Sequence, residues 1–235
     1  MVQVNTVPSL ENPRPLRIRF VKKGALQYIS HLDLVRTMTR AIVRAKVPVK
    51  YTEGYNPIPH MVFSAPLPIG AESNAEFLDI AVVSPVDHDD VLLRLNRNLP
   101  AELAIEEVYT PTAKFADIAF AEYQIRIRTP KASAELAEEC KHLLQQKPLI
   151  VCKQTKSGKK DTDISAAFAD VATAYAEGEV LLCVRLCADS GSFLKPAYFI
   201  DYLAAKLGIL TGSPLEEDYT VLRAHLYTKD MKDFR

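Results

Sequence analysis

The stretch LRIRFVKKGALQYISHLDLVRTMTRAIVRAKVP (residues 16–48) decides the first part of the fold, because its hydrophobic period changes once along its length. Residues 16–23 alternate apolar and basic side chains, which is typical of a β-strand. Ser30 and Asp33 form a pair similar to a capping box, which predicts a helix that begins at Ser30. Pro48 ends the helical pattern. The apolar face of this helix, which we expect to pack on a sheet, comprises Leu34, Met38, Ala41, Ile42 and Ala45.

The elements that follow complete a β-α-β-β-α-β order, which is the order of a ferredoxin-like split β-α-β unit. They are strands at residues 61–67 and 76–83, an acid-first helix at 86–99 and a closing strand at 103–111. The second half of the chain repeats the order loosely. Its elements are a strand at 122–130, a helix at 133–146, a strand at 148–155, a hairpin at 171–187, a helix at 196–208 and a strand at 219–228.

The sequence therefore predicts an α+β protein of two ferredoxin-like units in tandem, with antiparallel sheets and helices on one face. The second unit carries an extra hairpin. The expected division is a tail at 1–15, a unit at 16–111, a linker at 112–121, a unit at 122–229 and a tail at 230–235.

Composition places the chain among ordinary globular proteins, with 48% apolar and 25% charged residues. The sequence has no apolar run of about 20 residues, and its start lacks the basic and apolar regions of a signal peptide. We therefore expect a cytoplasmic protein with no membrane partner. The four cysteines form no C-x-x-C pair, so we expect small buried side chains in a reducing compartment and no metal site.

Basic residues concentrate at the start of the chain, where residues 1–60 carry ten Lys and Arg against three Asp and Glu. Arg36, Arg40 and Arg44 form one stripe on the outer face of the first helix, with Asp33 at its top. Like charges four residues apart cost a few tenths of a kcal/mol each, so the stripe indicates an anion site, most plausibly for phosphates. The alternative is a solvated basic face that pairs with the acidic segment at 72–107.

Two neighbouring features add polar chemistry to this region. His31 lies in the first turn of the helix, where backbone N–H groups favour an anion, although a packed, hydrogen-bonded histidine is the plainer interpretation. The loop YTEGYNPIPH (51–60) is made rigid by two prolines. Its side chains suited to base stacking and hydrogen bonding are Tyr51, Tyr55, Asn56 and His60. The alternative is a structural crossover between helix and strand.

The connection SAPLPIGAESNAE (64–76) lies, in a ferredoxin-like unit, at the same end as the turn before the helix. A mixed-charge cleft between the two loops is therefore the best pocket candidate. Its expected members are Lys22, Lys23, Ser30 and His31 on one side and Glu72, Ser73 and Glu76 on the other. The alternative is a hairpin loop with incidental acids. A lysine-rich loop at 153–163 is either solvated or a source of further phosphate contacts.

Motifs for nucleotide loops, zinc proteases, nucleophile elbows and radical-SAM iron–sulfur clusters are absent from the sequence. The candidate catalytic residues are then His31 and His60, which suit metal-independent acid–base chemistry.

Four segments, SHLDLVR (30–36), RAIVRA (40–45), YTEGYNPIP (51–59) and PLPIGAESNAE (66–76), together resemble the radical-SAM-linked domain of unknown function. That bacterial domain occurs fused behind, or encoded beside, cobalamin-type radical-SAM proteins. The specific matches cover about residues 16–82, and SGSFLKP (190–196) is similar only loosely. Ile58 departs from the pattern, which has a histidine there.

The resemblance implies a companion role to a radical-SAM protein on a separate chain. The iron–sulfur cluster, SAM and cobalamin are then expected on that partner, and no cofactor is expected in this chain. Our leading hypothesis is a non-catalytic accessory protein that binds an anionic ligand such as RNA on the arginine stripe. In it, Asp33 orients Arg36, His31 receives a phosphate or carboxylate, and Tyr55 and Asn56 contact the rest of the ligand. The alternatives are a metal-independent ribonuclease that uses His31 or His60, and a protein–protein adaptor without affinity for nucleic acid.

Overall fold

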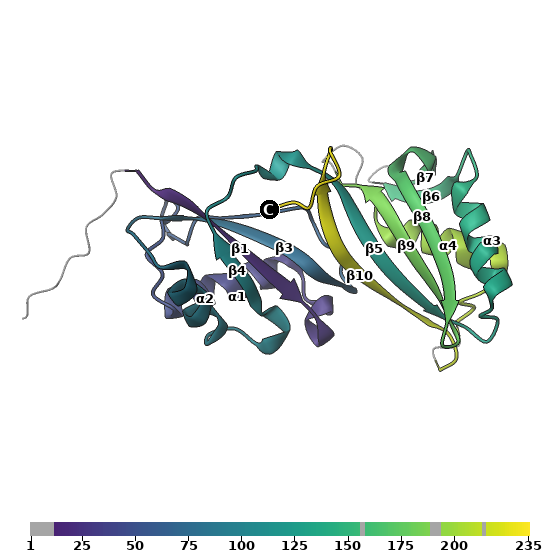
Figure 1. Ribbon diagram of the computed structural model, residues 1–235, viewed down its shortest axis with the longest axis horizontal. Helices are drawn as coiled ribbons and strands as arrows, with labels where there is room; N and C mark the ends of the chain where they lie inside the picture. Colours follow the sequence, from purple (N-terminus) through teal and green to yellow (C-terminus); the bar gives the residue numbers. More distant parts are fainter. Residues whose placement is uncertain (1–11, 156–157, 189–193, 213–214) are drawn as a thin grey trace, which may run out of the picture. The chain divides into compact units, whose positions relative to one another are not determined.

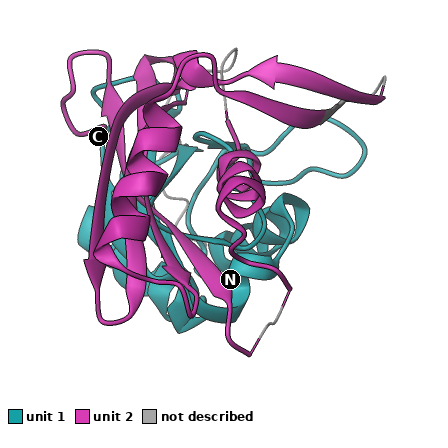
Figure 2. Ribbon diagram, turned by 90° about the vertical axis from the view of Figure 1, so that its right-hand side faces the viewer, with its two compact units in different colours: residues 1–114, 235 teal, residues 115–234 magenta. Residues whose placement is uncertain are grey.

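The structure is a computed structural model that describes residues 12–155, 158–188, 194–212 and 215–235. It consists of two compact units, one of residues 1–114 with Arg235 and one of residues 115–234 (Figure 2). Most of the predicted N-terminal tail, the tip of the lysine-rich loop and residues 190–193 lie outside the described residues.

Unit 1 has an antiparallel sheet in the order β4-β1-β3-β2, which is the order of a ferredoxin-like unit (Figure 1). Its elements are β1 (Arg14–Lys22), α1 (His31–Arg44), β2 (Met61–Phe63), β3 (Ala71–Val82), α2 (His88–Asn96) and β4 (Ile105–Tyr109). Short 3-10 turns occupy Gly24–Tyr28 and Ala101–Leu103. The predicted α+β class with antiparallel sheets is confirmed.

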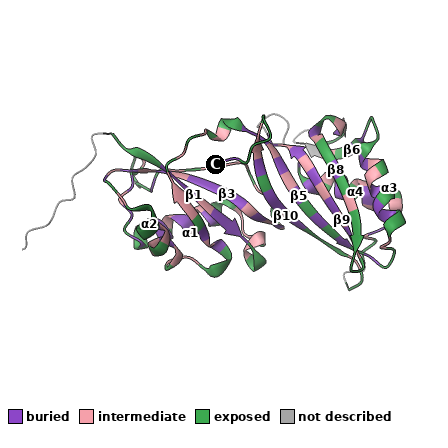
Figure 3. Ribbon diagram, in the orientation of Figure 1, coloured by how far each residue is buried: buried purple, intermediate pink, exposed green. Residues whose placement is uncertain are grey.

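The core of unit 1 lies between this sheet and its two helices. Leu16, Ile18 and Phe20 of β1 share one hydrophobic cluster with Met38 of α1 and Leu95 of α2, so both helices cover the same face (Figure 3). The α1 residues predicted to pack on the sheet are all buried, namely Leu34, Met38, Ala41, Ile42 and Ala45. On the opposite face, the buried guanidinium of Arg17 donates two hydrogen bonds of 2.7 and 2.8 Å to Asp79.

Unit 2 repeats the arrangement, with an antiparallel sheet in the order β10-β5-β9-β8. Its elements are β5 (Ile118–Arg128), α3 (Ala134–Gln145), β6 (Ile150–Thr155), β7 (Gly158–Asp163), β8 (Phe168–Ala176), β9 (Glu179–Cys187), α4 (Pro196–Leu207) and β10 (Asp218–Thr228). The β8–β9 hairpin turns at Glu177 and Gly178, whose φ angles of 52° and 80° suit a two-residue turn with both central residues left-handed.

Three details differ from the sequence-based expectation. The strand β5 begins at Ile118 rather than 122. The predicted strand at 148–155 pairs with β7 in a separate hairpin instead of joining the main sheet, because the lysine-rich run continues as a strand beyond Gly158. The strand β2 ends at Phe63, since Pro66 and Pro68 have no N–H to donate to a ladder.

The cysteines are free thiols in different surroundings. Cys140 is buried in the core, and burial raises the pKa of its thiol to about 11. Cys183 and Cys187 are half-buried, whereas Cys152 is exposed, which corrects the expectation that all four are buried. The described residues hold no group of three or more His, Cys, Asp or Glu suited to a metal ion. Of the helices in the described ranges, none is both long and apolar enough to span a membrane.

Candidate functional site

The start of α1 is fixed by a small hydrogen-bond network. The Ser30 hydroxyl accepts from the Asp33 backbone N–H at 3.2 Å and donates to the Asp33 carboxylate at 2.7 Å. Arg36 donates to the other Asp33 oxygen at 3.1 Å. These bonds, with Ser30 the larger influence, hold the pKa of the Asp33 carboxyl below its usual value. The Asp33 carboxylate therefore stays ionised and holds the guanidinium of Arg36 by a hydrogen bond.

The three arginines of α1 are all exposed on its outer face. Arg36 pairs with Asp33, while Arg40 and Arg44 have no acidic partner within the part of the chain that the structure describes. Arg94 of α2 donates to the carbonyls of Ala45 and Lys46 at 3.0 and 3.3 Å. The C-terminal end of α1 is thus satisfied by a different side chain, which leaves Arg44 without a capping role.

The acidic segment at 72–107 forms several contacts in the described structure, and none of these contacts is with Arg40 or Arg44. Asp79 binds Arg17, Glu106 and Glu107 bind Arg19, Asp90 binds Arg94 and Glu72 accepts from the Gly24 N–H. The expectation that this segment neutralises the stripe is therefore not met for these two arginines.

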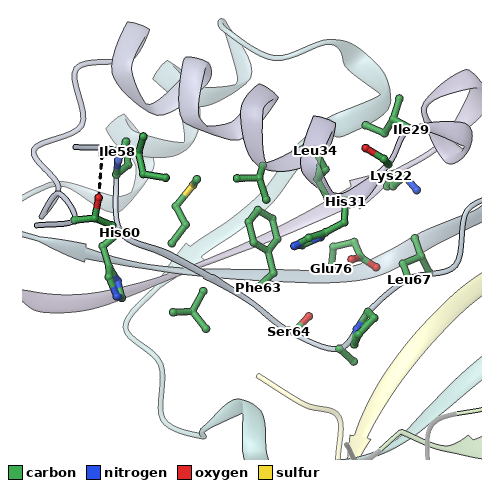
Figure 4. A pocket seen from close by; sticks show the side chains of 18 residues that line it. Lys22, Ile29, His31, Leu34, Ile58, His60, Phe63, Ser64, Leu67 and Glu76 are labelled. Atoms are coloured by element: carbon green, nitrogen blue, oxygen red, sulfur yellow. Dashed lines mark hydrogen bonds between the residues drawn. The ribbon is translucent and has the colours of Figure 1, made fainter. Parts of the chain in front are cut away.

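Next to the first turn of α1 lies a pocket of about 730 Å³, within unit 1 (Figure 4). One wall is formed by residues 29–31, 34 and 35 and the other by residues 58–67, and Lys22, Thr52 and Glu76 complete the lining. This volume lies within the range of small-molecule sites, which combine apolar walls with a few polar groups.

The polar groups of the pocket are unevenly distributed. Lys22 is 3% exposed and donates to the Gln27 carbonyl at 3.1 Å, and Glu76 is 5% exposed. Figure 4 shows His31 and Glu76 toward the Leu67 end and His60 at the opposite end beside Ile58.

The ring of His31 packs edge-on against Phe63, with 5.2 Å between the ring centroids. Since Phe63 lies between the two histidines in Figure 4, His31 and His60 do not face one reacting group in this arrangement.

The turn before α1 and the β2–β3 connection meet, as the ferredoxin-like order predicted. Lys22 pairs in register with Ser73, and the Gly70 N–H donates to the Gln27 carbonyl at 2.9 Å. Not every predicted member enters the pocket. Ser73 is fully buried and its hydroxyl accepts from the Ala75 N–H, while Lys23 is exposed and outside the lining.

The loop 51–60 is closed at its base and open at its tip. Tyr51 bridges to Pro59, and the Thr52 N–H donates to the Ile58 carbonyl at 2.8 Å. Tyr55 is 99% exposed and Asn56 is exposed, so the tip presents both side chains to solvent. They lie outside the pocket lining, as does Tyr51.

Sequence reasoning missed the apolar walls of the pocket. The hydrophobic pattern predicts an ordinary strand for Met61, Phe63 and Leu67, whereas all three line the pocket. Ile58 also lines it and adds an apolar side chain to the wall. The available signal was the spacing of prolines at 57, 59, 66 and 68, which keeps the chain extended and the strand short.

The chain belongs to a bacterial family described as "Uncharacterized protein conserved in bacteria (DUF2344)", whose model matches residues 15–196. A search of curated proteins finds no match.

Solved structures give only distant likenesses. A chain of a Cbf5-Nop10-Gar1 complex matches with a TM-score of 0.47 and 9% identity, over 94% of this chain and 56% of that chain, so this protein spans little more than half of its length. An unknown protein from Galdieria sulphuraria matches with a TM-score of 0.26 and 12% identity, over 89% and 97% of the two chains. These likenesses carry no argument about function.

Proposed function

We propose that the protein is a non-catalytic binding protein that holds an anionic ligand, in the first place single-stranded RNA, on the outer face of α1. The observation that carries the proposal is the exposure of Arg40 and Arg44 without an acidic partner in the described part of the chain. Residues four positions apart are separated by roughly 6 Å along the helix axis. Successive arginines of the stripe can therefore contact successive phosphates of a ligand. Arginine is well suited to phosphate because its planar fork donates two hydrogen bonds at once.

The tip of the loop 51–60 supplies the second part of the proposed site. Tyr55 and Asn56 are held out by a closed loop base, which keeps the entropic cost of presenting them low. An exposed aromatic ring is a stacking platform for an unpaired base. The role of Asn56 is then to hydrogen-bond a base edge.

The proposed biological setting comes from the sequence resemblance. We infer a companion role to a radical-SAM protein, with the cluster, SAM and cobalamin on that partner. The test of this part is co-purification of the tagged protein with its genomic neighbours from the native cell. If no radical-SAM protein co-purifies under low-salt conditions, the companion role is contradicted.

The test of RNA binding is the fluorescence anisotropy of a labelled single-stranded RNA of mixed sequence at several salt concentrations. The double variant Arg40→Ala/Arg44→Ala is compared with Arg126→Ala/Arg128→Ala, which removes the same charge from exposed positions of unit 2. We expect the α1 variant to lose at least about tenfold in affinity, and its salt slope to flatten by about 0.7 per arginine. Equal losses in both variants would contradict the proposal.

The same protein preparation and RNA distinguish the ribonuclease alternative from simple binding. RNA incubated with the protein and a metal chelator should stay intact if the protein only binds. Cleavage that disappears in His31→Ala or His60→Ala would replace the binding proposal by the enzyme.

A further inference from the structure

The strand β2 has a free edge. In the described part of the chain it pairs with β3 alone. The Ser64 N–H donates to the Phe77 carbonyl at 3.0 Å, and hydrogen-bonded pairs alternate along an antiparallel ladder. The backbone groups of Val62 therefore face β3, while those of Met61 and Phe63 face away from it. These outward N–H and C=O groups have no hydrogen-bond partner among the described residues.

The pocket runs along this free edge. It is lined by Met61, Val62 and Phe63 in succession, although successive side chains of a strand point to opposite faces. Consecutive lining residues mean that the pocket follows the strand edge rather than one face of the sheet. His31, Leu34 and Val35 of α1 form the opposite wall. A strand edge facing a helix across an apolar groove is the arrangement that binds an added peptide strand.

The surroundings define the chemistry of the occupant. Ile58 and Val62 line the groove and remain 46% and 45% exposed, so its rim is apolar. Residues 22–60, which form most of the surrounding surface, carry seven Lys and Arg against Asp33 and Glu53. A segment that alternates large apolar and acidic side chains complements both features.

We propose that an extended segment of a partner protein, with alternating acidic and large apolar residues, adds to the free edge of β2. Its backbone pairs with the outward groups of Met61 and Phe63, and one apolar side chain enters the pocket. Its acidic side chains lie against the basic surface of residues 22–60. This inference goes beyond the proposed RNA site, which lies on the outer face of α1. An unpaired strand edge presents N–H and C=O groups that can pair with a strand of another chain.

The test uses a pool of labelled peptides of about ten residues in which Asp or Glu alternates with Val, Ile, Leu or Phe. Binding is measured by fluorescence anisotropy, with the matched Lys and Arg pool as the control. Two further pools carry backbone N-methyl groups, one on all acidic and one on all apolar positions. Since only every second N–H of an added strand faces β2, we expect one methylated pool to lose at least about tenfold and the other to bind.

Variants locate the site. Met61→Pro removes an outward N–H without removing a ladder bond to β3, and Val35→Trp fills the pocket from α1. Both should weaken peptide binding at least about tenfold and leave RNA binding unchanged, which also shows that they fold. The control Val43→Thr, at an exposed position of α1 outside the pocket lining, should bind like the wild type.

Four outcomes would overturn the inference. They are absence of binding to the acidic pool, equal effects of the two methylation patterns, full binding by both variants, and displacement of the peptides by RNA. The last outcome would assign the pocket to the RNA site instead.

Discussion

The helices α1 and α3 occupy the same position in the two units, since each follows the first strand of a ferredoxin-like order. Both begin at a serine whose side chain accepts from the backbone N–H three residues later, Ser30 from Asp33 and Ser133 from Leu136. Both bury an apolar face of four residues at helical intervals of three and four: Leu34, Met38, Ala41 and Ile42 in α1, and Leu136, Ala137, Cys140 and Leu144 in α3. The cap and the inner face are what the fold requires of this helix.

The outer faces carry opposite charge. The exposed face of α1 presents the three arginines at 36, 40 and 44, whereas α3 presents Glu135, Glu138 and Glu139, with Lys141 near Glu138 at 3.8 Å. The same fold position therefore tolerates either sign. We therefore expect that folding does not depend on the arginine stripe, and this is the reason to look for its ligand.

The segments after the two helices differ as well. In unit 1, the segment between α1 and β2 lines the pocket of about 730 Å³. In unit 2, the hairpin β6–β7 follows α3, and the cavity beside residues 144–147 has a volume of about 170 Å³. In the described part of unit 1, the arginine stripe of α1 is therefore followed directly by the exposed loop 51–60 and by the segment that lines the pocket of about 730 Å³.

The largest expected effect on stability comes from the shared inner face. Met38→Ala and Leu144→Ala each remove a fully buried side chain, so each should lower the free energy of unfolding by about 2–5 kcal/mol. Urea denaturation followed by circular dichroism measures both. A loss below about 1 kcal/mol in only one of them would break the equivalence of the two helices.

The shared caps come next. Ser30→Ala and Ser133→Ala each remove the acceptor for a backbone N–H at a helix start, at a cost of about 1 kcal/mol. Ser30→Ala also removes the hydroxyl that donates to the Asp33 carboxylate. Thr substitutions at the same positions are the controls, because threonine keeps the capping oxygen and should restore most of the loss.

A smaller, pH-dependent loss should distinguish the first turn of α1. The pKa of Asp33 lies below its unfolded value near 3.8, so its carboxylate stabilises the fold above that pH. This contribution disappears as the pH falls through the lower folded pKa. Between about pH 5 and pH 2, the wild type should therefore lose more stability than Asp33→Asn. If the free energy of unfolding of the two proteins falls in parallel with pH, the hydrogen bonds from Ser30 and Arg36 do not lower the pKa of the Asp33 carboxyl.

The loop tip should have the smallest effect on folding. Tyr55 is 99% exposed, so Tyr55→Ala should change the free energy of unfolding by less than about 0.5 kcal/mol. If the ring stacks on a base, the same variant should lose about 1–3 kcal/mol of RNA-binding free energy. Tyr175→Ala, on an exposed strand residue of unit 2, is the matched control for RNA affinity.

Much of the fold was predictable because local signals and the core agree. The Ser30 start, the buried face of α1 and the strand–helix order of unit 1 all follow from hydrophobic period and capping chemistry. The hairpin β6–β7 was not predictable as a strand pair, because β7 is almost all charged or polar and its residues are largely exposed. Its pairing depends on backbone bonds across Gly158 and not on a hydrophobic pattern.

The candidate site was predictable only in part. Lys22 at the end of β1, His31 at the start of α1 and Glu76 of β3 line one pocket because the ferredoxin-like order brings these elements together. The position of His60 at the other end of the pocket depends on how the proline-rich segment crosses over, which no periodicity encodes. Ser73 looked available in the sequence but is turned inward, because its place in β3 alternates with the pleat.

The most direct measurement of the central claim is a charge reversal on α1, Arg40→Glu/Arg44→Glu, which gives this helix the acidic character of α3. Unfolding free energy and RNA affinity are determined on the same preparation. The account predicts a change in unfolding free energy below about 1 kcal/mol together with loss of RNA binding. RNA affinity equal to that of the wild type, or a loss of stability of several kcal/mol, would contradict the claim that the stripe serves a ligand and not the fold.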